Sequence, residues 1–572
     1  MIVYDFEIFI EDWLVVFKEL PTNNYKIIVN DTKELIEYVS NNTLKFFVGY
    51  NNKQFDDIIL SGIFSGVEPY TTMTCLMNIE NKYDAYKLLD IKQLGLLSID
   101  LMQDILGMSL KQAEGYMNLS VEECSIPFNI DRKLTESELQ EVIKYCVHDV
   151  DSTEALLEKR KAYVGSKLTL IKMFDLPLNN ITKTNSNLCA AVLRATSKKH
   201  NDELYYDLPD TVNITNPVYR KVLDLYIGHP LDYTKSMTLN ICGLPHKLAY
   251  GGIHAAKENF IYEGEMWDSD VTSYYPSLMI KYHYQSRNVL SEDMFSEIYW
   301  RRIDAKKNKL KDIADALKLI INTAYGATKS KFNALFDPKM ANQVCVTGQL
   351  LLIDLLEKLE PYITLVQSNT DGILYIPHNK EKIKEILFEW QERTGMGMET
   401  EVFKKIWQKD VNNYIIVDEH DVVKVKGGYV GQYYEPGTSE NPQLRNNARI
   451  LDIATVDYFI NGIKPEDTIN KATDIHLFQY ITKTGRTYDN TYWEHNGLEC
   501  EVNNVNRVYS SKNINDGKLF KIKRVGELIR KDSIANLPPH CAVDNGNTLT
   551  LDDIDKTWYI DQAHKRINDF LE

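Results

Sequence analysis

The first 165 residues alternate short apolar runs with amphipathic segments, a pattern that predicts a mixed α/β unit. Residues 1–9, "MIVYDFEIF", are apolar at positions 2, 3, 6, 8 and 9 and predict an opening strand. Residues 48–60 predict a strand, an Asn-rich turn and the start of a helix, and residues 141–153 predict a helix. Residues 166 to about 245 then predict a mostly helical connection.

Two glycines in "AYGGIHAA" (249–256) mark a break, after which a second α/β body is predicted. Its pattern gives a strand and helix over 265–280 and two helices within 300–330. "VQSNTDGILY" (366–375) predicts a β-hairpin, because Asn, Asp and Gly supply a turn between residues that favour strands. Residues 410–430 predict a second hairpin, and after about 430 the segments become shorter and more polar.

The composition is that of an ordinary soluble protein of several domains, with 572 residues, 44% hydrophobic and 26% charged. No apolar run approaches the roughly 20 residues that a membrane span needs, and the opening segment carries acids where a signal peptide carries basic residues. We therefore expect a cytoplasmic protein, in the host cytoplasm if it is viral, with no membrane partner. The eight cysteines include no closely spaced pair, so free thiols are expected.

The charge distribution points to one anionic ligand. The net charge of −16 argues weakly against a protein that coats nucleic acid. Between Arg301 and Lys331, however, nine basic residues stand against three acids. A basic stripe on an acidic body indicates a defined anionic ligand.

Several acidic residues in the N-terminal unit have a spacing that places them together. Asp5 and Glu7 share one face of the opening strand, because side chains alternate along a strand. Asp56 follows the Asn-rich turn, and Tyr145 and Asp149 are four apart on one helix face. Taken singly, Asp5 and Glu7 are more simply explained as exposed residues at a sheet edge. Asp56 is more simply a helix cap, and Asp149 a solvated acid.

Together the spacings resemble the three exonuclease motifs of the DEDD nucleases in their tyrosine-bearing form. The resemblance implies a ribonuclease-H-like fold in which Asp5, Glu7, Asp56 and Asp149 hold two divalent cations and Tyr145 orients the attacking water. Oxygen ligands suit Mg²⁺, and two cations about 4 Å apart can stabilise both reacting oxygens of a phosphodiester. The resemblance also implies DNA contacts from Asn51 or Asn52, Phe55, Ser109 and Leu110, although Ser109 before a helical run is usually a cap.

The stretch "DVTSYYPS" (270–277) resembles motif A of the family B DNA polymerases. This pattern selects Asp270 over Asp268, because only Asp270 stands at the required distance from Tyr275. The resemblance implies that Asp270 and the carbonyl of Val271 bind the catalytic cations. It also implies that Tyr275 lies beneath the sugar of the incoming nucleotide, where its ring leaves no room for a 2′-hydroxyl.

Lys318, Asn322 and Tyr325 recur at i, i+4 and i+7 on one helix face, and their spacing resembles motif B of the same family. The resemblance implies that Lys318 meets the triphosphate and that Asn322 and Tyr325 line the nascent base pair. Arg302 and Lys306, four apart on the preceding helix, would then bind the β and γ phosphates. The plainer alternative for residues 317–330 is an amphipathic helix ended by Gly326. For residues 300–309 it is a solvated charged face.

The hairpin at 366–375 falls where motif C belongs, with Asn369-Thr370-Asp371-Gly372 in place of the family's Asp-Thr-Asp-Ser. Asp270 and Asp371 still make a two-carboxylate site, so we predict that polymerase activity survives the asparagine. Further DNA contacts are implied more weakly. Tyr414 fits a Lys-x-Tyr element of the family, with Lys424 and Lys426 nearby, but Asn412 replaces its lysine. Gly251 and Gly252 resemble a YxGG-type element, but Tyr250 is adjacent to them instead of spaced.

The predicted fold class is multidomain α/β, a ribonuclease-H-like exonuclease followed by a right-hand polymerase. The expected ranges are 1–165 exonuclease, 166–248 helical connection, 249–296 and 336–430 palm, 297–335 fingers, and 431–572 thumb and C-terminal region. Two Mg²⁺ or Mn²⁺ ions are expected in each active site. The expected partners are primer-template DNA and dNTPs, together with replication proteins such as a helicase or a single-strand-binding protein.

The chain length is close to that of protein-primed phage polymerases, but the motif spacing leaves little room for their insertions. Lys318 lies only 48 residues after Asp270, and Asp371 only 46 after Tyr325. We therefore predict a compact phage-type enzyme that extends an ordinary primer. Two alternatives remain open, an exonuclease with an inactive polymerase body and a non-catalytic DNA-binding protein.

Overall fold

The computed structural model describes residues 1–105, 107–526 and 528–572, which form a multidomain α/β protein. The N-terminal body is built on a five-stranded sheet with the order β3-β2-β1-β4-β5. Strands β1 to β3 pair antiparallel, whereas β4 and β5 run parallel to β1. The strands are β1 (Ile2–Ile8), β2 (Trp13–Glu19), β3 (Asn24–Val29), β4 (Phe46–Gly49) and β5 (Leu97–Asp100). The helices are α1 (Thr32–Asn41), α2 (Asp56–Phe64), α3 (Pro69–Asn78), α4 (Ala85–Leu88), α5 (Leu110–Tyr116) and α6 (Glu136–Lys159).

The opening strand, the strand–turn–helix at 48–60 and the helix over 141–153 are all confirmed. Helix α6 is longer than its predicted core at both ends, and a capping box of Thr135 and Glu138 fixes where it begins. The connection that follows holds α7 (Lys161–Met173), α8 (Asn185–Val192) and a hairpin of β6 (Met237–Ile241) and β7 (Leu244–Leu248). Helix α7 continues across the expected domain boundary at residue 165.

The second body is built on a seven-stranded antiparallel sheet with the order β14-β13-β12-β9-β11-β10-β8. Its strands are β8 (Ala255–Ala256), β9 (Phe260–Val271), β10 (Ile363–Ser368), β11 (Gly372–Pro377), β12 (Met398–Asp410), β13 (Asn413–Asp418) and β14 (Val423–Lys426). Helices α9 (Tyr274–Lys281), α12 (Pro338–Leu359) and α13 (Lys380–Thr394) pack with it. Both predicted hairpins, β10–β11 and β13–β14, are confirmed.

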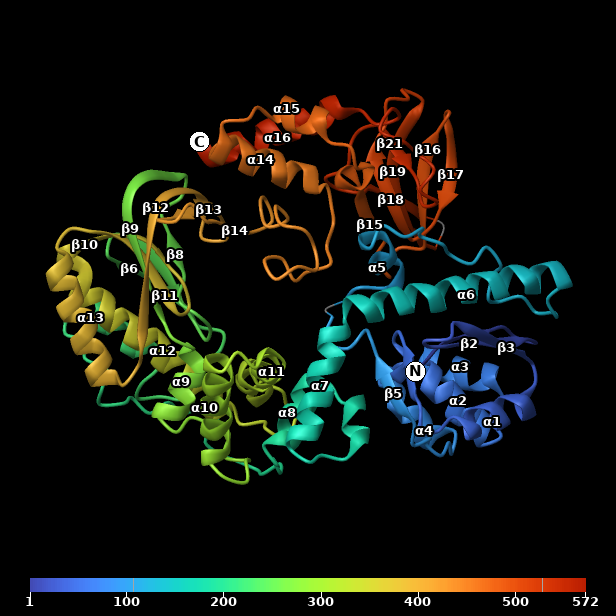
Figure 1. Cartoon of the computed structure of the whole chain (residues 1–572), viewed down its shortest axis with the longest axis horizontal. Coiled ribbons are helices and arrows are strands. Elements are labelled where there is room, and N and C mark those ends of the chain that lie inside the picture. Colours follow the sequence, from blue (N-terminus) through green and yellow to red (C-terminus); the bar gives the residue numbers. More distant parts are fainter. Residues whose placement is uncertain (106, 527) are drawn as a thin grey trace.

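Two helices, α10 (Asp293–Lys307) and α11 (Lys311–Thr328), form a pair that projects from this body and lies beside α7 and α8 (Figure 1). Both helices agree with the two predicted within 300–330, and α11 continues past Gly326 to Thr328. The alternative in which Gly326 ends the helix is therefore wrong. Nothing lies within 4 Å of a Cβ added at Gly326, so a neighbour's close approach does not require this glycine.

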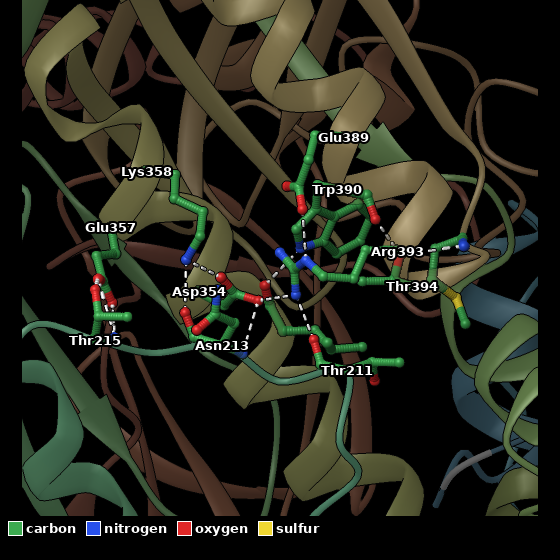
Figure 2. Close-up of polar contacts among 12 residues, drawn as sticks. Thr211, Asn213, Thr215, Asp354, Glu357, Lys358, Glu389, Trp390, Arg393 and Thr394 are labelled. Carbon is green, nitrogen blue, oxygen red and sulfur yellow. Dashed lines mark hydrogen bonds and ion pairs between the residues drawn. The ribbon is translucent and has the colours of Figure 1, made fainter.

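A buried ion-pair network holds the connecting chain against helices α12 and α13 of the second body (Figure 2). Asp354 of α12 is fully buried and pairs with Lys358 and with Arg393 of α13, the latter at 2.7 Å. Asn213 donates its backbone N–H to the same carboxylate at 3.2 Å. Charges buried this deeply are held by their pairing, so the network fixes the connection against the helices that support the sheet.

The described part of the C-terminal body contains two small sheets and three α-helices. The sheets have the orders β15-β18-β21 and β17-β16-β19-β20. The strands are β15 (Tyr480–Lys483), β16 (Asn490–His495), β17 (Leu498–Val502), β18 (Val505–Ser510), β19 (Asp516–Val525), β20 (Leu528–Ser533) and β21 (Cys541–Val543). The helices are α14 (Arg449–Asn461), α15 (Pro465–Lys471) and α16 (Lys556–Leu571). This body lies against α5 of the N-terminal body (Figure 1).

All eight cysteines are free thiols, as the sequence predicts. Across the described ranges, no helix is both long and apolar enough to cross a membrane.

Candidate active sites

The N-terminal body brings its four predicted carboxylates together. Asp5 and Glu7 share one face of β1, and Glu7 is only 7% exposed. Asp56 is the first residue of α2, where the backbone N–H of Phe6 donates to its Oδ1 at 3.1 Å. Asp149 is buried on α6. Three segments that are distant in sequence, β1, α2 and α6, thus bring their carboxylates together.

The pKa values of these carboxyl groups show how strongly they are crowded. Burial and the charges of Asp56, Glu7 and Asp149 raise the pKa of Asp5 well above its usual range. Burial and Asp149 do the same for Glu7. Burial raises the pKa of Asp56 to about 8 and that of Asp149 to about 6. Buried carboxylates that repel one another and offer only oxygen ligands fit divalent cations such as Mg²⁺.

Lys111 of α5 is a residue of this site that the sequence predictions do not include. Its Nζ pairs with Asp149 and, at 3.1 Å, with Glu114. The same Nζ lies 4.6 Å from the ring centroid of Tyr145. Burial lowers the pKa of Lys111, but the carboxylates of Asp149 and Glu114 outweigh it and raise the pKa overall. The only sequence signal is its place directly after Ser109 and Leu110.

Tyr145 lies one helical turn before Asp149 and is half-buried. Burial and the charges of Asp149, Glu7 and Asp5 raise its pKa, so the phenol stays protonated. Cys146, the next residue, is fully buried and lies with Asp5 and Glu7 in one small cluster. Burial raises the pKa of its thiol well above the usual range, which keeps it neutral.

The structure separates the two asparagines that the sequence leaves as alternatives. The side chain of Asn52 is buried and donates to Ser98 Oγ at 2.7 Å. Asn51 is more accessible, and its backbone N–H donates to Asp100 Oδ1 at 2.8 Å. Asn51 is therefore the one whose side chain is free to meet a ligand, and Asp100 holds its backbone.

The other proposed DNA-end contacts have structural roles of their own. Phe55 is half-buried against the core of the N-terminal body. Ser109 caps α5, accepting a hydrogen bond from the N–H of Gln112 at 3.4 Å, and Leu110 is the first residue of that helix. The capping role anticipated for Ser109 is present, and contact with DNA stays a prediction.

In the second body, the β10–β11 hairpin carries Asp371 to the end of β9. Gly372 is the Cα partner of Asp270 across the β9–β11 pair. The N–H of Val271 donates to the carbonyl of Asp371 at 2.8 Å, which locks the turn to the end of β9. Both aspartates are exposed, so their carboxylates are open to a ligand.

Acidic residues on neighbouring strands surround Asp270. Asp268 lies two residues earlier on the same face of β9, opposite Glu401 of β12. Desolvation and the charges of Asp371 and Glu401 raise the pKa of Asp270 to about 6. Desolvation, Asp270 and Glu401 raise that of Asp268 to about 7. Glu399 and Glu401 were not predicted, although the alternating acids of "METEVF" give a strand signal.

A pocket of about 260 Å³ opens beside this carboxylate pair. It unites three segments that are predicted separately, and the aromatic rings of Tyr275 and Tyr325 lie 4.5 Å apart, centroid to centroid. The lining residues are Ser273, Tyr274, Tyr275, Pro276, Ile321, Asn322, Tyr325, Thr370 and Asp371. The structure therefore brings the segments that resemble motifs A, B and C to one place.

The predicted phosphate-binding cations lie on α10 and α11, outside the lining of this pocket. Lys318 and Lys306 are exposed. Arg302 is only 8% exposed, and its Nε has no hydrogen-bond partner among the described residues. That Nε is itself buried, so an anion would reach it only after the surrounding side chains move.

The remaining candidates lie on the strands beyond β12. Tyr414 of β13 lies near Asp268, and desolvation followed by that charge raises its pKa to about 12. Lys424 of β14 pairs with Glu401, and the Nζ of Lys426 lies 5.8 Å from the ring centroid of Tyr414. All three therefore stand beside the acidic cluster.

Gly251 and Gly252 differ in their surroundings. Nothing lies within 4 Å of a Cβ added at Gly251, whereas one added at Gly252 would stand 2.1 Å from Thr370 Oγ1. Gly252 is thus required by the close approach of the turn between β10 and β11. Contact of either glycine with DNA stays a prediction.

Comparison with known proteins gives a distant structural similarity. No known protein family and no curated protein match the sequence. Among solved structures, the chain is similar to the family B DNA polymerase from the hyperthermophilic archaeon Pyrobaculum calidifontis, with a TM-score of 0.42 and 12% sequence identity. The alignment covers 100% of this chain and 78% of that one.

Proposed function

We propose that this protein is a DNA-directed DNA polymerase that extends a primer with dNTPs and proofreads with a 3′–5′ exonuclease, in DNA replication of the phage type. The observation that carries the proposal is the junction of β9 with the β10–β11 hairpin. There Asp270 and Asp371 stand together at a pocket lined by Tyr275, Asn322 and Tyr325. The three segments that form it resemble three motifs of one polymerase family.

In the polymerase site, Asp270, Asp371 and the carbonyl of Val271 would hold two Mg²⁺ or Mn²⁺ ions. These ions, when bound, would stabilise both the entering and the leaving oxygen of phosphoryl transfer. Tyr275 supports the sugar of the incoming nucleotide and excludes a 2′-hydroxyl by the bulk of its ring.

The remaining residues of the polymerase site bind the base pair and the phosphates. Asn322 and Tyr325 line the nascent base pair. Lys318, Arg302 and Lys306 bind the triphosphate, for which α10 and α11 must bring them toward the pocket.

In the exonuclease site, Asp5, Glu7, Asp56 and Asp149 hold the cations and Tyr145 orients the attacking water. The sheet order β3-β2-β1-β4-β5, with antiparallel and then parallel pairing, supports a ribonuclease-H-like body. The primer end would be met by Asn51, Phe55, Ser109 and Leu110. An error that frays the primer end lets that end move to this second site.

The proposed architecture places the exonuclease at residues 1–165 and the palm around the seven-stranded sheet. The fingers are the α10–α11 pair, and the thumb belongs to the C-terminal body. Gly251, Gly252, Tyr414, Lys424 and Lys426 are proposed to contact primer-template DNA. A helicase and a single-strand-binding protein are proposed partners, because a chain without the insertions of protein-primed enzymes needs help to open duplex DNA.

The test uses a 5′-labelled primer annealed to a longer template, incubated with Mg²⁺ in the presence or absence of dNTPs. Wild-type protein is expected to lengthen the primer with dNTPs and shorten it without them. Asp270→Ala should reduce extension by about 100-fold or more while degradation continues, and Asp5→Ala should do the reverse. Each substitution removes a ligand from only one of the two sites.

Asp210→Ala, which changes an exposed acid of the connecting segment, is the matched control and should behave as wild type. Degradation without any extension by the wild-type protein would establish the alternative of an exonuclease with an inactive polymerase body. Loss of both activities in either single variant, with the fold intact by circular dichroism, would contradict the two-site proposal. Absence of both activities in the wild type would favour a non-catalytic DNA-binding protein.

A further inference from the structure

The turn that carries Asp371 is held from one side by a residue outside the three motifs. His254 lies just before β8, which pairs with β10 beside the turn. Its Nδ1 is 3.2 Å from Asn369 Oδ1, and its Nε2 is 3.3 Å from Thr370 Oγ1. One imidazole thus spans the two residues that precede Asp371.

A neutral imidazole can make both contacts at once. With the proton on Nδ1, the ring donates to the amide oxygen of Asn369 and accepts from the hydroxyl of Thr370 through Nε2. The side-chain oxygen of Asn369 is an uncharged acceptor. At this position, therefore, asparagine supplies the hydrogen bond without adding another negative charge beside Asp270 and Asp371.

The opposite side of the turn is fixed by the backbone. The N–H of Asn369 donates to the carbonyl of Gly372 at 2.8 Å, and the carbonyl of Asp371 accepts from Val271. These bonds fix the main chain but leave the side chains of Asn369 and Thr370 to other partners. Gly252 approaches Thr370 so closely that even a Cβ there would displace it.

From this geometry we infer that His254 is a positioning residue for DNA synthesis, clamping Asn369 and Thr370 so that Asp371 is presented to Asp270. The inference rests on the proposed polymerase function and deepens it. It also gives Asn369 a role of its own, as the acceptor in the clamp. His254 does not contact the substrate in this role and acts only through the turn.

The first experiment measures steady-state extension by His254→Ala, Asn369→Ala and the double variant. His254→Ala should lower kcat by about tenfold with the KM for dNTP changed less than about twofold, because the carboxylate is misplaced while the nucleotide pocket remains. Asn369→Ala should lower kcat by a smaller factor, because the contact with Thr370 survives. The double variant should be no slower than His254→Ala, since both changes remove a shared contact.

The matched control is His378→Ala. His378 lies at the other end of the β10–β11 hairpin, where its Nε2 is 2.7 Å from Thr364 Oγ1. That variant should extend primers at the wild-type rate. Exonuclease activity on single-stranded DNA should be unchanged in all four variants. If His254→Ala extends at the wild-type rate, or if the two single losses multiply in the double variant, the clamp does not exist.

Hydrogen–deuterium exchange over residues 366–373 supplies a readout that needs no activity. His254→Ala should raise exchange of the Asn369 amide several-fold, and His378→Ala should leave it unchanged. If the wild type never extends a primer but the amide loses protection in His254→Ala, the clamp stands and the polymerase proposal fails. If the wild type extends primers and neither exchange nor kcat responds, the inference about His254 is overturned.

Discussion

Gly372 is the residue on which the geometry of the carboxylate pair depends. A Cβ built on it would lie 1.5 Å from Asp270 Oδ1. The backbone on either side is tied to β9, so relief must come from rotation of the Asp270 side chain. The glycine thus reserves the space that the Asp270 carboxylate occupies.

We predict that Gly372→Ala lowers primer extension by about 100-fold, because a metal ligand turned away from its site loses most of its effect. Exonuclease activity and the melting temperature should change little, since the Asp270 side chain is exposed and can rotate. The assay is primer extension set against degradation of single-stranded DNA. Gly485→Ala, at a glycine with nothing within 4 Å of an added Cβ, is the control. If Gly372→Ala extends primers at the wild-type rate, the Asp270 side chain needs no fixed rotamer for synthesis.

At the scale of elements, β1 shows how a strand concentrates charge. Its two-residue period directs Asp5 and Glu7 to one face, where α2 adds Asp56 and α6 adds Asp149. Each of these carboxyl groups has a folded-state pKa above its unfolded value. The native protein therefore binds more protons than the unfolded chain between about pH 4 and pH 8, and its unfolding free energy falls as pH rises through that window.

We predict that, in EDTA, the melting temperature falls between pH 5 and pH 8. Asp56→Asn should flatten this dependence, because Asp56 has a pKa of about 8 and contributes across the whole window. Mg²⁺ should raise the melting temperature more at pH 8 than at pH 5.5, since binding requires deprotonated carboxylates. Scanning calorimetry on the wild type, Asp56→Asn and the control Asp210→Asn measures both effects. A pH dependence equal in all three proteins would disprove the assignment to this cluster.

Elements with strong local patterns were predictable from the sequence. The β10–β11 hairpin is specified by its own turn residues, and β1 by its apolar run. Asp270, Tyr275 and Tyr325 lie on three elements, β9, α9 and α11. Their place in one site was expected from the resemblance to motifs A and B, because strand and helix periods alone do not bring distant elements together.

What escaped prediction depends on contacts between distant segments. Strand β12 lies beside β9 and brings Glu401 next to Asp268, which the pattern of neither segment reveals. Lys111 reaches Asp149 only because α5 packs beside α6. The burial of Arg302 likewise follows from helix packing, because a period of four places Arg302 and Lys306 on one face without saying what covers it.

At the scale of the whole molecule, the C-terminal body holds α5, the helix that carries Lys111 to the carboxylate cluster of the N-terminal body. The buried Arg507 donates to the carbonyl of Leu119 at 2.6 Å, just beyond α5. Gln479 donates to the carbonyl of Gly115 at 3.0 Å. These contacts secure the end of α5, and the same helix carries Lys111 onto Asp149 and Tyr145.

The contact is so close that it excludes a methyl group. A Cβ at Gly115 would lie 2.5 Å from Ile481 Cδ1, and Ile481 is itself buried on β15. Cγ1 and Cγ2 of the same side chain would lie 2.9 and 3.1 Å from that Cβ, so turning Cδ1 alone does not relieve the overlap. Overpacking of this kind costs about 1–3 kcal/mol where the structure cannot relax.

We predict that Gly115→Ala lowers exonuclease activity by about tenfold while primer extension changes less than about twofold, because Lys111 moves with α5. The double variant Gly115→Ala/Ile481→Ala, in which the obstructing side chain is removed, should recover most of the lost activity. Gly165→Ala in α7, where nothing lies within 4 Å of an added Cβ, controls for the effect of alanine in a helix. An equal loss of exonuclease activity in the single and double variants would mean that alanine at position 115 perturbs α5 directly, without involving Ile481. Equal loss of both activities would mean that the contact stabilises the whole chain and does not tune the exonuclease site.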